Sequence, residues 1–120
     1  MTPNKRSTGS HYEDIAAGEL TKRGYRILER NFYSRAGEID IVASEGGYLV
    51  FVEVKYRTKR TSGYPEEAVS HTKQVRICKA ALFYMTRYQI SEDTPVRFDV
   101  VAIDPDEIRV IPNAFEFVTR

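Results

Sequence analysis

The chain has 120 residues, of which 42% are hydrophobic, 12% aromatic and 29% charged, and its 18 basic and 17 acidic residues leave a formal net charge of +1. The apolar content excludes intrinsic disorder, and the length suits one compact domain that can bury a core without disulfides or a structural metal. The near-neutral total excludes a uniformly basic nucleic-acid-binding protein, but it leaves open a segregation of charges onto different faces.

The metal chemistry open to the chain is restricted by its composition. Cys78 is the single cysteine, which excludes an intrachain disulfide and a cysteine-based zinc site. Two histidines are too few for most transition-metal sites, so a bound metal is expected to take carboxylate ligands, which favours Mg²⁺, Mn²⁺ or Ca²⁺. No run approaches about 18 apolar residues and residues 1–10 lack the apolar segment of a signal peptide, so we expect a cytoplasmic protein.

Residues 1–9 are polar and are expected to form a flexible tail, followed by a single domain over 10–120. Periodicity and turn signals predict, in chain order, a helix over 10–23, extended segments over 25–33, 38–44 and 48–56, a helix over 70–88, strands over 96–104 and 108–111, and a tail of uncertain type over 113–118. Because the second helix is a crossover, the strands that it joins are predicted to be parallel. The fold class is therefore α/β, with a mixed sheet flanked by helices.

The hairpin between the second and third extended segments carries an unusual set of charges. Glycines at 46–47 indicate a two-residue loop, which places Asp40 opposite Glu53, and Glu38 opposite Lys55, with all four side chains on one face. Opposed carboxylates repel each other, so the pair suits either a solvated face or a divalent cation between the two strands. A bulge or a longer loop would break this register. The other face of the hairpin is predicted to be core, through Ile39, Ile41, Val50, Val52 and Val54.

Each predicted helix carries one charged residue at or beside its apolar stripe. Glu13 lies at helical spacing from Ala16 and Leu20, and a carboxylate there needs either an Arg or Lys partner or a metal. Lys73 lies one turn before Ile77, at the edge of the second helix's apolar stripe. Its ammonium group either extends to solvent or reaches a phosphate near the hairpin.

A block of basic residues leaves the end of the third extended segment. It consists of Lys55, Arg57, Lys59 and Arg60. Such a block is either a solvated loop or a surface that follows a phosphate backbone. Two other polar residues are assigned to structure instead: Asp99 as an ion-pair partner of Arg97 on the same strand face, and Cys78 as a core residue of the second helix.

Residues 37–40 and 51–55 together resemble the D…ExK core of the PD-(D/E)xK, restriction-endonuclease-like nuclease superfamily. Nearly the whole chain is similar to the YraN-like family of small bacterial proteins assigned to that superfamily. The segments that carry this resemblance are 12–17, 24–31, 37–42, 51–57 and 97–101. The resemblance implies an α-β-β-β-α-β core of restriction-endonuclease-like fold.

The resemblance also implies roles for individual residues. Asp40 and Glu53 match the metal-binding acids, Lys55 matches the catalytic lysine, and Glu13 matches a first-helix acid of the Holliday-junction-resolvase branch. The implied metal set is therefore Asp40, Glu53 and Glu13, with Mg²⁺ or Mn²⁺ as the cofactor. Two positions depart from the pattern: Ile39 stands where the motif has proline, which changes no ligand, and Tyr12 stands where the family usually has glycine.

The sequence therefore predicts a metal-dependent nuclease that hydrolyses phosphodiester bonds in DNA, with branched or structured DNA as a candidate substrate. The nucleic-acid contacts are expected from Arg57, Lys59, Arg60 and Lys73. One alternative is a non-catalytic nucleic-acid-binding module that retains the fold, and another is an interaction protein whose acids form only ion pairs. A homodimer would place two such sites about a twofold axis, as cutting both strands of a symmetric junction requires.

Overall fold

The computed structural model describes residues 5–57 and 69–118 of the chain. The elements in this part of the chain are α1 (Lys5–Lys22), β1 (Arg26–Tyr33), β2 (Glu38–Glu45), β3 (Tyr48–Tyr56), α2 (His71–Arg87), β4 (Val96–Ile103) and β5 (Ile108–Phe115). Their order confirms the predicted sequence of helices and strands. Neither of these helices is both long enough and apolar enough to cross a membrane.

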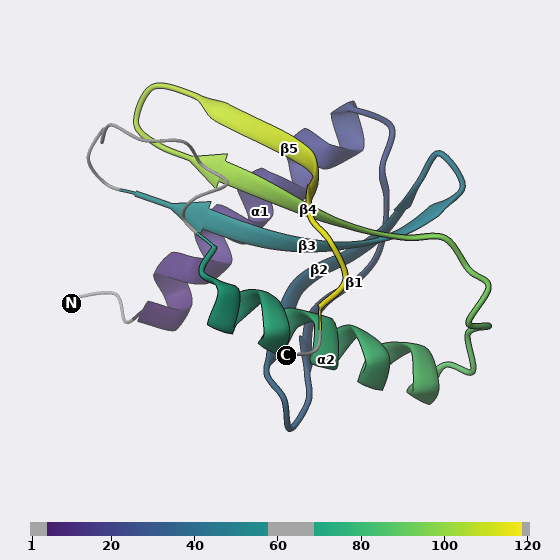
Figure 1. Ribbon diagram of the computed structural model, residues 1–120. Helices are drawn as coiled ribbons and strands as arrows, with labels where there is room; N and C mark the ends of the chain where they lie inside the picture. The colour runs from purple at the N-terminus through teal and green to yellow at the C-terminus, as the bar shows by residue number, and fades with distance from the viewer. Residues whose placement is uncertain (1–4, 58–68, 119–120) are drawn as a thin grey trace.

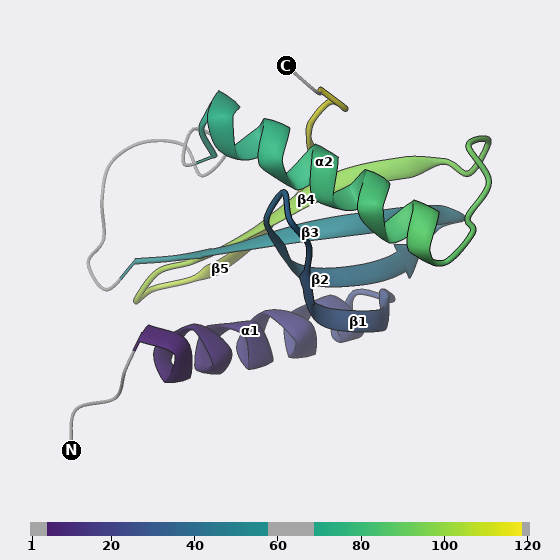
Figure 2. The ribbon, with the colours of Figure 1, turned by 90° about the horizontal axis from the view of Figure 1, so that it is seen from below.

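The five strands form one mixed sheet in the order β1-β2-β3-β4-β5 (Figure 1). Only the β3–β4 pair is parallel among the four strand pairings of the described chain, which confirms the prediction made from the crossover helix. The two helices cover opposite faces of the sheet, so the molecule has three layers (Figure 2). This arrangement is the α/β class expected from the sequence.

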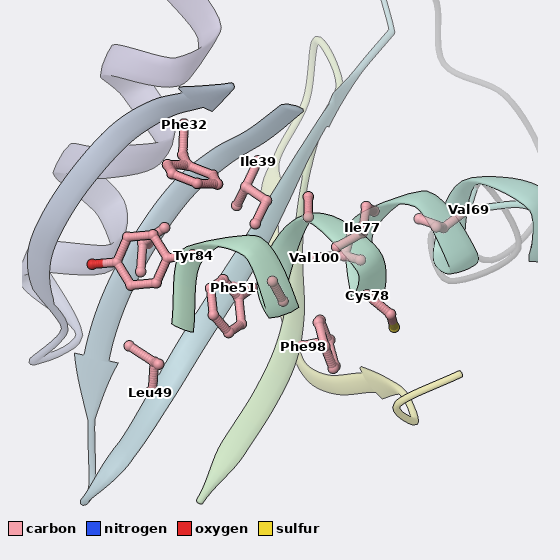
Figure 3. Packing of buried hydrophobic residues seen from close by; sticks show 13 residues of the cluster. Phe32, Ile39, Leu49, Phe51, Val69, Ile77, Cys78, Tyr84, Phe98 and Val100 are labelled. Carbon is pink, nitrogen blue, oxygen red and sulfur yellow. The ribbon is translucent and has the colours of Figure 1, made fainter. Parts of the chain in front are cut away.

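Each face of the sheet has its own hydrophobic cluster. On the α1 side the fully buried Leu20 packs with residues of β2, β3 and β4. On the α2 side Phe51 and Phe98 stack on each other, and Tyr84 of α2 meets Phe51 edge to face (Figure 3). Cys78 is fully buried in this second cluster, as predicted. Both helices are therefore held to the sheet by apolar packing, which fixes the positions of the polar residues at their ends.

Two element boundaries differ from the prediction. Helix α1 begins at Lys5 rather than at Ser10, so residues 5–9 are helical and are not a tail. The polarity of this segment was the wrong guide to its conformation, because Lys5 and Arg6 are good helix formers although Ser7, Thr8 and Gly9 are not. Strand β5 continues to Phe115 instead of ending at 111, because a bulge at Asn113 (φ 52°) lets the strand resume pairing with Phe98.

The β2–β3 hairpin has the predicted two-residue loop. Gly46 and Gly47 both have positive φ (58° and 85°), as the tight turn requires, and Glu45 pairs with Tyr48. The ladder continues only as far as Ile41 and Val52. The predicted backbone pairing of Asp40 with Glu53 is therefore wrong, because both residues lie beyond the last pair of the ladder.

The two strands separate beyond the last pair of this ladder. There the Asp40 carboxylate accepts a hydrogen bond from the Val54 amide at 2.8 Å, so a side chain takes the place of a backbone carbonyl. The predicted alternation also fails: Ile39 packs in the α2-side cluster, whereas Ile41 packs in the α1-side cluster. At this end β2 pairs only with β1, so the pairing with β3 no longer fixes which way the β2 side chains point. The separation opens the sheet at the position of the acidic residues.

Candidate metal centre

A cavity of about 820 Å³ lies where β2 and β3 separate. All of the elements from α1 to α2 contribute to its wall. We call it the acidic cavity, and it is lined by Ser10, Glu13, Asn31, Tyr33, Glu38, Asp40, Glu53, Val54, Tyr56 and Lys73. Residues from both helices meet here although the helices cover opposite faces of the sheet, because the cavity lies at the open end between the strands.

Three carboxylates in this cavity lie close enough to share one ion. Glu13 from α1 and Glu38 and Asp40 from β2 each offer an oxygen, and these oxygens lie within 4.8 Å of one another. Glu38 and Asp40 are two residues apart on one strand, so they can approach the same point. Glu13 reaches the same point because the apolar face of α1 is fixed against the sheet by Leu20.

The Asp40 carboxyl group shows how strongly this cluster opposes its own ionisation. Burial, followed by the charge of Glu53 and then those of Glu13 and Glu38, raises the pKa of Asp40 to about 8. The hydrogen bond from the Val54 amide lowers the pKa but does not offset these effects. A group in this environment stays charged at neutral pH only when a cation is close.

Glu13 has a second feature that fits a cation ligand. It is 8% exposed, and its Oε1 atom is buried without a hydrogen-bond partner among the described residues. Arg30 Nη2 lies 3.9 Å from that oxygen, beyond hydrogen-bonding distance, and instead contacts Asp14 at 2.7 Å. Burial, and next the Glu38 charge, raises the pKa of Glu13. Buried carboxylate oxygens normally have partners, so the unpartnered atom fits a metal ligand.

The donor set of the cluster fits a hard divalent cation. All three side chains offer carboxylate oxygen, which suits Mg²⁺ or Mn²⁺ rather than a soft metal. The cavity is large enough to leave room for water and a substrate oxygen beside the ion. Glu13, Glu38 and Asp40 are therefore the residues that would hold a metal here.

Glu53 lines the same cavity but is engaged differently. Its side chain is 5% exposed, and its Oε1 lies 2.6 Å from Nζ of Lys73. Burial opposes the charge on Lys73, but the hydrogen bond to Glu53, the charges of Glu53 and Asp40 and the contact with Lys55 together outweigh it and raise the pKa of Lys73. The lysine expected at the edge of a helix stripe, directed either to solvent or to a phosphate, is thus the partner of an acid in this structure.

Lys55 lies beside Lys73, at the end of β3. Its half-buried side chain loses solvation, and this effect, followed by the neighbouring charge of Lys73, lowers the pKa of Lys55. The charges of Glu53 and Asp40 act in the opposite direction. Lys55 therefore lies next to Lys73 and close enough to feel the charges of Glu53 and Asp40, and it is the lysine less disposed to keep its proton.

The sequence placed the acidic residues correctly in the same region, but it assigned Glu38 no role as a ligand. The available signal was that Glu38 shares a strand face with Asp40, two residues away. The basic block is only partly described: Arg57 is exposed and lines a different hollow together with Tyr12, and Lys59 and Arg60 lie outside the described residues.

Asp99 is fully buried and belongs to a separate network at another part of the sheet. Its carboxylate accepts hydrogen bonds from the Arg97 guanidinium at 2.9 Å, from the Tyr25 hydroxyl at 2.6 Å and from the backbone N–H of Asn113 at 2.9 Å. Arg97 also contacts Glu45 at 3.1 Å. The prediction of an ion pair between Asp99 and Arg97 is confirmed, and the partners already made leave little capacity for a metal.

The mixed sheet with a helix on each face and acids contributed by α1, β2 and β3 defines a protein of the restriction-endonuclease-like fold. One solved structure with this fold is that of Hjc, a Holliday junction resolvase from the archaeal hyperthermophile Archaeoglobus fulgidus. It aligns with a TM-score of 0.53, covering 88% of this chain and 73% of the Hjc chain at 20% sequence identity. At that identity the similarity concerns the fold alone.

The chain belongs to the uncharacterised protein family UPF0102, whose model matches residues 12–103. It is 53% identical over 113 residues to a UPF0102 protein of Lachnoclostridium phytofermentans, covering 94% of this chain and 96% of the relative. It is 50% identical over 123 residues to a UPF0102 protein of Geobacter sulfurreducens, covering 90% and 94% of the two chains. UPF0102 is the YraN-like family expected from the sequence, so both the family and the fold are confirmed.

Proposed function

We propose that this protein is a metal-dependent nuclease that hydrolyses phosphodiester bonds in DNA, with Mg²⁺ or Mn²⁺ as its cofactor. The observation that carries the proposal is the approach of Glu13, Glu38 and Asp40 oxygens within 4.8 Å, with Glu13 Oε1 buried and without a partner in the part of the chain that the structure describes. The same cavity holds Glu53 and Lys73, so both signs of charge needed to bind a cation and a phosphate are present.

The metal would be held by Glu13, Glu38 and Asp40. A divalent cation supplies charge neutralisation for the phosphoryl oxygens and lowers the pKa of water in its coordination shell. Asp40 is fixed for this task by its hydrogen bond to the Val54 amide, and Glu13 by the packing of α1. Glu53 faces the same space and can bind the ion directly or through water once Lys73 leaves it.

The lysines would act on the substrate. Lys55 is suited to orient the attacking water and to stabilise the developing hydroxide by donating a hydrogen bond to it. Lys73 is suited to contact a phosphate oxygen and to stabilise negative charge as it develops in the transition state. These roles use two ammonium groups that already lie next to each other, with Lys73 lining the acidic cavity.

DNA is the proposed substrate, and branched or structured DNA is its proposed form. The fold is shared with Hjc, whose described activity is on Holliday junctions. The contact along the phosphate backbone would be extended by the basic residues that follow β3 in the sequence, which are Arg57, Lys59 and Arg60.

A non-catalytic nucleic-acid-binding module is the second candidate, and one contact favours it. Because Lys73 already neutralises Glu53, part of the acidic charge is balanced without any metal. This alternative expects DNA binding to persist without divalent cations and Asp40→Asn to preserve or strengthen it. The nuclease proposal expects the same substitution to abolish metal-dependent cleavage.

The test is a cleavage assay on linear, flapped and four-way DNA substrates with Mg²⁺, with Mn²⁺ or with chelator. The matched control is Asp40→Asn, because the asparagine carbonyl oxygen can still accept the Val54 hydrogen bond while its charge is removed. We expect cleavage by the wild type only with a divalent cation. Cleavage of equal rate in Asp40→Asn would overturn the assignment.

A further inference from the structure

We propose that Lys73 is a positioning residue that exchanges between Glu53 and a DNA phosphate, so that metal and DNA promote each other's binding. This inference rests on the proposed function and adds a coupling between its two ligands. In the absence of both ligands Lys73 holds Glu53; with both present, Glu53 faces the metal and Lys73 contacts the phosphate.

Lys73 and Glu53 are in close contact, but their side chains differ greatly in solvent exposure. Nζ and Oε1 lie 2.6 Å apart, yet the Glu53 side chain is 5% exposed and the Lys73 side chain 41%. Both residues line the acidic cavity, but Glu53 is nearly enclosed there, whereas Lys73 remains partly open to solvent. If the pair opens, it is therefore the lysine that moves.

The position of Lys73 in its helix is electrostatically unfavourable unless an anion is near. Its backbone is fixed in the first turn of α2, where its amide donates to the side chain of the N-cap Ser70 at 3.2 Å. The first turn of α2 contains no acid, so a lysine adds positive charge to the positive end of the helix dipole. Glu53 balances the charge of Lys73 in this structure, and a phosphate bound at the acidic cavity would balance it equally well.

The exchange follows from the shared use of one carboxylate. A cation that engages Glu53 competes with the ammonium group of Lys73, and it leaves that group without a partner beside Lys55, which carries the same sign of charge. A phosphate that draws Lys73 away leaves Glu53 buried and without a counter-ion, which strengthens its attraction for the metal. By linkage, the factor by which DNA tightens metal binding equals the factor by which metal tightens DNA binding.

The test compares metal affinity with and without DNA in wild type, Lys73→Met, Lys73→Gln and Lys73→Arg. Calorimetric titration with Mg²⁺ is done on the protein alone, and titration with Ca²⁺ on the protein with and without a four-way DNA, the DNA being checked afterwards for cleavage. Lys79→Met is the matched control, since Lys79 is an exposed lysine of the same helix.

We expect DNA to tighten metal binding by wild type by roughly tenfold. Without DNA, Lys73→Met and Lys73→Gln should bind metal about tenfold more tightly than wild type and gain nothing further from DNA. Lys73→Arg should keep the coupling, and Lys79→Met should behave as wild type. Thermal melting of each variant checks that it is folded, and the two neutral variants guard against one of them failing to fold.

Unchanged or weaker metal binding in both neutral variants, with metal binding still lost in Asp40→Asn, would overturn the exchange and leave the metal site standing. That pattern would mean that Lys73 supports Glu53 without competing for it. Absence of metal binding in the wild type as well would overturn the proposed function, and the exchange with it.

Discussion

Asp40→Asn should stabilise the metal-free protein, because the folded chain confines an acid whose ionisation it opposes. Burial, Glu53 and the other acids raise the pKa of Asp40 from 3.8 to about 8. The pKa of Asp40 is higher in the folded chain than in the unfolded chain. The free energy of unfolding is therefore not reduced by this group below about pH 4, and it falls as the pH rises toward about 8. The asparagine carries no charge and can still accept the 2.8 Å hydrogen bond from Val54.

The magnitude follows from the shift in pKa. One unit corresponds to about 1.4 kcal/mol, so the full shift sets an upper limit of about 5 to 6 kcal/mol. The carboxylates of the cavity share their protons and the site can relax, so we expect a gain of about 2 kcal/mol. For a domain of this size that is about 8 °C in Tm.

The assay is thermal melting with chelator at about pH 4 and at about pH 8.5, with the exposed Asp93→Asn as the control for loss of an acidic charge. Asp40→Asn should exceed wild type at the higher pH and match it at the lower. With Mg²⁺, wild type should gain stability with concentration, and Asp40→Asn should not. A variant less stable than wild type at about pH 8.5 would refute the electrostatic reasoning.

Three further outcomes are expected. Glu38→Gln should weaken Mg²⁺-induced stabilisation by at least tenfold in concentration, whereas the exposed Glu92→Gln should not change it in the same melting assay. Tyr25→Phe should cost about 1.5 to 3 kcal/mol in urea unfolding, because it removes the 2.6 Å hydrogen bond to charged Asp99. Because burial, followed by the contact with Asp99, raises the pKa of Tyr25 to about 12, wild type alone should lose this advantage as the pH rises from about 10 to about 12; a parallel loss in the Phe variant would contradict this. Leu20→Ala should cost about 2 to 5 kcal/mol and reduce Mg²⁺ affinity as well, and a loss of stability without any change in Mg²⁺ affinity would argue against α1 packing as the support of Glu13.

The architecture could be predicted because it depends on local rules. Hydrophobic periodicity located the helices and strands, the glycines at 46–47 fixed the hairpin loop, and the crossover helix required parallel neighbours. The two-residue spacing on one strand correctly grouped Glu38 with Asp40, although the alternation fails between Ile39 and Ile41, and helical spacing correctly placed Glu13 beside the core. Each of these inferences involves residues within one element or one hairpin.

The details of the acidic cavity could not be predicted because they depend on where regular structure stops. The ladder ends at Ile41, so Asp40 bonds the Val54 amide instead of facing Glu53 across a continuing strand pair. The contact of Lys73 with Glu53 joins residues from different elements, and neither periodicity nor spacing determines which side chains meet across the sheet. The helical start at Lys5 could not be predicted either, because residues 5–9 combine good helix formers with Ser7, Thr8 and Gly9 and carry no apolar stripe.

The central claim is that Glu13, Glu38 and Asp40 form a divalent-metal site. Anomalous diffraction from crystals grown with Mn²⁺ tests it most directly, with Asp40→Asn crystals as the control. We expect one strong anomalous peak in the acidic cavity, at coordination distance from oxygens of these three residues in the wild type and absent from the variant. No peak in the cavity, or a peak of equal height in Asp40→Asn, would contradict the claim.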